Sequence, residues 1–131
     1  MSNLISEPII QNTVKDAKYI FIFFKIYQCN PCNRFKGVPN SESPWNKIIN
    51  NKELESLGVQ CIIYEHGYKD HNFYRLPLPF SHFVTYGPYL YLYQKNYLDA
   101  GKTYPKEFST DNANAIIKWI KKQIDDKSLY F

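Results

Sequence analysis

The hydrophobic pattern divides the chain into short apolar runs and a long amphipathic segment. Runs rich in β-branched and aromatic residues predict buried strands at residues 19–26, 59–64 and 89–94. The runs are too short to be membrane-spanning helices. Near the C-terminus, apolar residues at helical spacing predict a last helix that ends at about Asp126, with Thr110 or Asp111 as its N-cap. The chain is therefore expected to mix strands with helices.

Helix signals also occupy the stretch between the first two predicted strands. Pro31 suits the first turn of a brief helix, which Gly37 ends. The Ser-Pro pair at 43–44 begins another helix, which residues 50–51 bend or end before Gly58 stops it. Because a crossover of this length favours parallel pairing, the first two strands are expected to form a β-α-β unit.

Other segments leave alternatives open. Ser6 can cap a short helix, but residues 9–10 fit an edge strand nearly as well. Residues 65–86 are expected to form a long loop with some helix, whose aromatic side chains suit either partner recognition or packing over the sheet. Residues 97–104 can return as an antiparallel edge strand, with Gly101 at a bulge. This element order predicts an α/β sandwich, a central mixed sheet with helices on both sides.

Two cysteines separated by two residues follow the first predicted strand directly. Cys29 falls at the junction of strand and helix, where unpaired amides and the helix dipole are expected to lower the pKa of its thiol. A thiolate beside a second thiol is a site of disulfide exchange. In the reductive direction we expect Cys29 to attack a substrate disulfide and the deeper Cys32 to resolve the mixed disulfide.

These features resemble the thioredoxin family over residues 19–124, because a proline precedes the second cysteine and a Gly-Pro pair precedes a later strand, like the family's cis-proline. The resemblance implies a thioredoxin-like three-layer sandwich that exchanges disulfides with protein substrates bearing disulfides or thiols. It also implies a thioredoxin-reductase-type enzyme as electron donor. The implied catalytic residues are Cys29 and Cys32. The implied substrate-binding residues are Asn30, Pro31, Gly87 and Pro88.

The chain departs from the family pattern near these residues. Phe23 lies where the family often has a buried carboxylate that accepts a proton. Gly87 precedes the proline where a branched residue is more usual, and Pro79 is the alternative to Pro88 for the proline bend. Lys25 would modulate the reduction potential if it pointed toward the sulfurs, although a surface position is expected for it.

Other functions remain as alternatives to the redox hypothesis. Cys29, Cys32, Cys61 and His66 could together hold a zinc ion, although Cys61 suits a small core position better. A glutaredoxin-like protein would carry Thr-Val-Pro and late Gly-Gly signals, which this sequence lacks. The remaining alternative is an adaptor with the thioredoxin fold, which binds a partner and does not use its cysteines catalytically.

Length and composition narrow the class of protein. The 131 residues fit a single domain, 1–131, with a genuine core, and the spread lysines behind the net charge of +4 indicate no nucleic-acid partner. No basic segment followed by an apolar core begins the chain, and three cysteines are too few for a disulfide scaffold. We therefore expect a cytoplasmic protein, or a virion protein if its AT-rich residue usage is viral, with no cofactor, metal or membrane contact.

Overall fold

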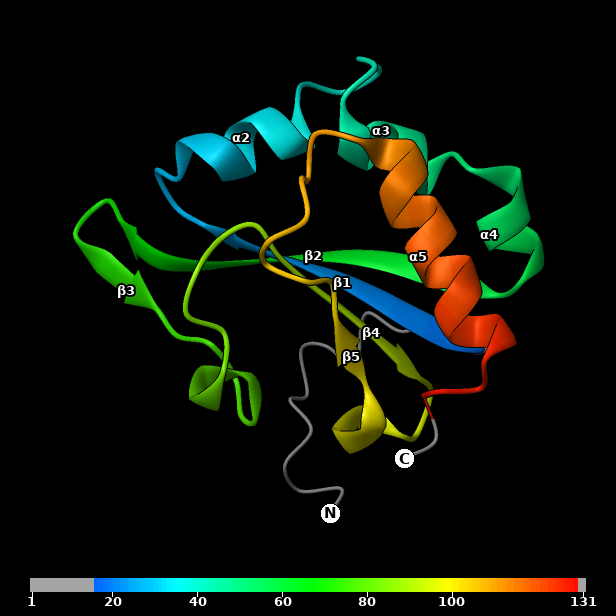
Figure 1. Ribbon diagram of the computed structural model, residues 1–131. Coiled ribbons are helices and arrows are strands. Elements are labelled where there is room, and N and C mark those ends of the chain that lie inside the picture. The colour runs from blue at the N-terminus through cyan, green and yellow to red at the C-terminus, as the bar shows by residue number, and fades with distance from the viewer. Residues whose placement is uncertain (1–15, 130–131) are drawn as a thin grey trace.

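The computed structural model describes residues 16–129, which form a mixed sheet with α-helices packed on it (Figure 1). The sheet has five strands in the order β3-β2-β1-β4-β5. Strand β1 pairs in parallel with β2, and the β1–β4, β2–β3 and β4–β5 pairs are antiparallel. The strands are β1 (Tyr19–Ile26), β2 (Val59–Lys69), β3 (Asn72–Tyr74), β4 (Tyr89–Gln94) and β5 (Lys102–Thr103).

The helices begin and end close to the residues that the sequence predicts. Ser43 accepts a hydrogen bond from the Asn46 amide, and Asn51 caps the next helix through the Leu54 amide. The last helix starts later than expected, because Asn112 is its N-cap. The α-helices are α2 (Asn30–Lys36), α3 (Pro44–Ile49), α4 (Lys52–Ser56) and α5 (Ala113–Asp125). The 3-10 helices are η2 (Phe80–His82) and η3 (Leu98–Ala100).

Alternate residues of the central strands build two separate hydrophobic clusters. On one face, Phe21 and Phe23 of β1 pack with apolar residues of α2, α3, α4 and α5. On the other face, Ile22 and Phe24 pack with Phe80 of η2 and with η3. Within residues 16–129 all four α-helices contact one face, and the helices expected on the other side are only the short 3-10 helices η2 and η3. Loops and 3-10 turns that carry large aromatic rings cover the opposite face.

The second strand is longer than predicted and the last strand is shorter. Strand β2 continues through residues 65–69 and turns back into β3, so part of the expected loop is a hairpin. The expected return strand is reduced to β5, because η3 takes its first half. The two alternatives for residues 6–10 lie outside the described residues. Within 16–129, no helix combines the length and apolarity that a membrane crossing requires.

Candidate functional site

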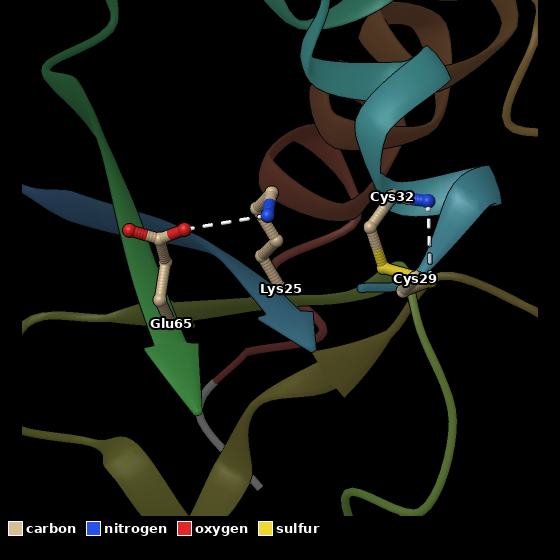
Figure 2. Close-up of a disulfide and its surroundings, with 4 residues drawn as sticks. All are labelled: Lys25, Cys29, Cys32 and Glu65. Carbon is tan, nitrogen blue, oxygen red and sulfur yellow. Dashed lines mark hydrogen bonds and ion pairs between the residues drawn. A yellow bond between two sulfur atoms is a disulfide. The ribbon is translucent and has the colours of Figure 1, made fainter. Parts of the chain in front are cut away.

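The structure joins Cys29 and Cys32 in a disulfide at the end of β1. Cys29 is the N-cap of α2, Pro31 lies in the first turn, and the two Cα atoms are 5.2 Å apart. The Cys32 amide donates a hydrogen bond to Cys29 Sγ over 3.2 Å, as Figure 2 shows. An N–H that donates to this sulfur favours a thiolate over a thiol once the bond is reduced.

The two sulfurs differ in their access to solvent. Cys29 is partly exposed, and the neighbouring Asn30 and Pro31 are exposed. Cys32 has no exposed surface and belongs to the helix-side hydrophobic cluster. A second protein can therefore approach Cys29 but not Cys32, as the predicted roles of attacking and resolving thiol require.

The Gly87-Pro88 segment lies directly against the disulfide. A Cβ atom built on Gly87 would lie 2.6 Å from Cys32 Sγ and 3.2 Å from Ile26 Cδ1. Only a residue without a side chain leaves room for the sulfur, which explains the glycine where a branched residue is more usual. The bonds before Pro88 and before Pro79 are both cis, so the two candidate prolines share this feature. The Gly87-Pro88 segment is the better candidate for the bend beside the thiols, because Gly87 contacts Cys32.

An ion pair between a buried lysine and an exposed glutamate lies on the same face of the sheet as Cys32 (Figure 2). Lys25 Nζ is 3.3 Å from Glu65 Oε2, and the Lys25 side chain is only 10% exposed. The expected surface position for Lys25 is therefore wrong. The parallel register places Glu65 beside Lys25, and Lys25 follows Phe23 on the helix-side face of β1. Sequence reasoning missed Glu65 because residues 65–86 were expected to form a loop.

Phe23 occupies a fully apolar environment. Its ring packs edge-on against Phe35 at 4.8 Å and lies 5.3 Å from Trp45. A carboxylate at this position would be buried among hydrocarbon groups without a partner, at a large cost in folding free energy. Glu65, on the neighbouring strand, is a carboxylate on this face of the sheet, where it is partly exposed and paired with Lys25.

The residues of the zinc alternative do not meet. His66 and Cys61 lie on opposite faces of β2, because Cys61 packs on the helix side while His66 contacts Phe24. In the described part of the chain, no three His, Cys, Asp or Glu side chains are placed to hold a metal ion. Burial raises the pKa of Cys61 to about 12, so this free cysteine stays a thiol at neutral pH. The sequence predicts Cys61 to be a small core residue, and it packs against the helix-side cluster while remaining only partly buried.

His66 is buried on the other face of β2, and its Nε2 has no hydrogen-bond partner among residues 16–129. Burial lowers the pKa of this imidazole from its ordinary value of 6.5. The unfolded chain therefore binds a proton at a higher pH than the folded protein does. The folded protein therefore loses stability as the pH falls through the pKa of His66 in the unfolded chain. The loss stops growing once the pH is below the lower pKa of His66 in the folded protein.

We expect the free energy of unfolding of the wild type to fall between pH 7.5 and pH values below about 6, because of the proton taken up by unfolded His66. A His66→Leu variant, which cannot titrate, is expected to lose this part of the pH dependence. Urea unfolding at several pH values measures both curves. His82→Gln, at an exposed histidine, is the matched control and is expected to follow the wild type. Parallel curves for His66→Leu and the wild type would contradict the assignment.

The site thus brings together an accessible sulfur, a buried sulfur and a glycine-proline bend, with the Lys25–Glu65 ion pair on the same face of the sheet. These parts come from β1, α2, β2 and the segment before β4. Comparison with protein-family models, with curated proteins and with solved structures finds no match to this chain.

Proposed function

We propose that this protein is a thioredoxin-like thiol–disulfide oxidoreductase that exchanges disulfides with protein substrates through Cys29 and Cys32. The observation that carries the proposal is the pairing of an accessible sulfur at a helix start with a fully buried sulfur one turn later. A purely structural disulfide has no need of this asymmetry, whereas exchange requires one sulfur to be reached and the other to be held back.

The strand and helix order supports a thioredoxin-like fold. The parallel β1–β2 pair, the antiparallel β4 and β5, the helix after β1 and the final α5 follow the order that the sequence resemblance implies. The face covered by η2 and η3 departs from that pattern, because no described α-helix packs there. The departure lies away from the face that holds Cys32 and α2.

The proposed reaction moves two electrons from the protein to its substrate. The Cys29 thiolate attacks one sulfur of the substrate disulfide, whose S–S bond breaks while the other substrate sulfur leaves as a thiolate and takes a proton. The Cys32 thiol then loses its proton and attacks Cys29 Sγ, which releases the second substrate sulfur as a thiol. The products are a substrate dithiol and the Cys29–Cys32 disulfide.

The substrate is proposed to lie across four residues around the sulfurs. Asn30 and Pro31 are exposed beside Cys29, Gly87 is partly exposed against Cys32, and Pro88 is buried, so Pro88 would act by shaping the bend and not by direct contact. A dithiol donor must then reduce the protein again, and a thioredoxin-reductase-type enzyme is the proposed class. Within this proposal the protein works without a cofactor or metal, away from membranes and nucleic acid, in a reducing compartment such as the cytoplasm.

Reduction of insulin in the presence of dithiothreitol tests this function. We expect the wild type to speed the precipitation of the freed B chain well above the rate with dithiothreitol alone. A Cys29→Ser/Cys32→Ser variant is expected to show only the background rate. If the wild type does no better than this variant, the disulfide is structural and the adaptor alternative takes its place.

A further inference from the structure

The β2–β3 hairpin carries exposed aromatic side chains that the core does not use. Tyr68 and Phe73 lie directly across from each other, with ring centroids 4.9 Å apart. They are 70% and 55% exposed, and the nearby Tyr74 is 45% exposed. Large exposed rings that gather on one element mark an interaction surface more often than isolated ones do.

The aromatic hairpin, residues 67–74, carries Tyr68 and Phe73 on one face and Tyr74 on the other, and the Tyr74 face contacts the segment before the disulfide. The Tyr74 ring contacts the Tyr27 ring edge-on at 5.4 Å, and Tyr27 lies two residues before Cys29. The Tyr27 amide also donates a hydrogen bond to the His66 carbonyl over 2.9 Å. These two contacts anchor the hairpin to the segment that presents the accessible sulfur.

Strand β3 also offers backbone groups for pairing. It is the outermost strand of the sheet and pairs only with β2 among the described strands. All three of its residues are exposed. A free edge of this kind accepts an extended segment as an additional strand, while pockets or rings beside it select the side chains.

The charges around this surface are mostly positive. Lys69 Nζ lies 5.2 Å from the centre of the Tyr27 ring, and Arg75 follows β3 directly. Asp70 lies at the hairpin turn, and Glu65 on β2 is already paired with Lys25. An acidic segment therefore complements this surface, and a basic one is disfavoured.

We propose that the aromatic hairpin docks the substrate protein, by taking up an extended segment with acidic and apolar side chains that flanks the substrate's disulfide. The segment pairs with the β3 edge, its apolar side chains contact Tyr68 and Phe73, and its carboxylates face Lys69 and Arg75. This inference rests on the proposed function and adds the chemistry of the preferred substrate to it.

The test compares three disulfides as substrates. Two synthetic peptides carry the same internal disulfide. The acidic peptide has alternating Glu and Leu on one side of it, and the basic peptide has alternating Lys and Leu there. The third substrate, hydroxyethyl disulfide, has no flanking chain. We expect the wild type to reduce the acidic peptide with a kcat/KM about tenfold above that for the basic peptide, which corresponds to about 1.4 kcal/mol. Tyr68→Ser/Phe73→Ser is expected to lose most of this advantage, and Lys69→Glu/Arg75→Glu to reverse the preference.

Two matched variants change an exposed aromatic ring or an exposed charge outside the hairpin, as controls for the hairpin variants. Tyr97→Ser removes a 45% exposed ring that follows the far end of β4, and Lys52→Glu reverses a charge on α4, away from the hairpin. Both are expected to keep the wild-type preference, and every variant is expected to reduce hydroxyethyl disulfide at the wild-type rate. Equal kcat/KM values for the two peptides, or a preference that survives both hairpin variants, would overturn the docking proposal.

Binding measurements separate the docking proposal from the proposed function. A fluorescent acidic peptide with serines in place of its cysteines tests docking by anisotropy without any disulfide chemistry, and hairpin-dependent binding is expected. Failure to reduce hydroxyethyl disulfide would instead count against the redox function. Sedimentation tests the remaining occupant: a wild-type dimer that becomes monomeric in Tyr68→Ser/Phe73→Ser would show that a second copy covers this edge and would overturn the proposal.

Discussion

Replacing Cys32 with serine is expected to leave the protein covalently attached to its substrate. Cys29 remains accessible and still attacks the substrate disulfide, but the hydroxyl at position 32 cannot displace the mixed disulfide. Serine is close to cysteine in size, so the buried site next to Gly87 is expected to accommodate it. Turnover in the insulin assay should fall to the background rate while a mixed disulfide accumulates.

A non-reducing gel measures the trapped species, which dithiothreitol should release. Cys29→Ser is the contrasting variant, because it removes the only active-site sulfur that a second protein can reach, and it is expected to trap nothing. Cys61→Ser is the matched control for loss of a cysteine elsewhere, and it should keep both turnover and the normal gel pattern. Inactive Cys32→Ser protein without any trapped species would contradict the assignment of attacking and resolving sulfurs.

The second large effect is expected from adding one methyl group at Gly87. The new Cβ would lie 2.6 Å from Cys32 Sγ, well inside contact distance, so the sulfur or the chain before β4 must move. Overpacking of this kind typically costs about 1–3 kcal/mol of stability. A shift of the resolving sulfur by about 1 Å can also lower the rate by roughly a hundredfold. Gly87→Ala is therefore expected to lose exchange activity out of proportion to its loss of stability.

Gly101→Ala provides the matched control for this variant. A Cβ on Gly101 would lie 2.6 Å from Tyr91 Cε2, which is a comparable overlap on the opposite face of the sheet from Cys32. Urea unfolding and insulin reduction, measured on both variants, separate stability from chemistry. We expect similar losses of stability but a large loss of exchange rate only for Gly87→Ala. Equal effects of the two variants on the rate would show that Gly87 has no particular role at the site.

The ion pair between Lys25 and Glu65 places a positive and a negative charge on the face of the sheet that holds Cys32. Its cation is buried on the face of the sheet that holds Cys32, and its carboxylate remains partly exposed. A lysine taken out of water needs a partner, because an unpaired buried charge is strongly destabilising. The partner comes from the neighbouring strand, because the β1–β2 register places Glu65 opposite Lys25.

The amino-acid sequence by itself determined the local elements and the position of the cysteine pair. The apolar runs predicted β1 and β4 with their observed bounds, and the breaks at Gly37 and residues 50–51 are where the structure has them. These features depend on neighbours a few residues apart, through side-chain periodicity, proline geometry and capping by Ser43 and Asn51. Local chemistry was enough to place Cys29 at the start of a short helix.

Only the tertiary structure decided which distant residues meet at the site. Gly87 contacts Cys32 and Lys25 pairs with Glu65 because the sheet register joins segments about 40 or more residues apart in the chain. The same register left β3 as an outer edge with exposed rings, whereas the sequence pattern allowed a loop there. Aromatic composition did not reveal which rings would cover the sheet and which would face water, because tyrosine and phenylalanine occur in both places. Packing between distant strands settled that choice.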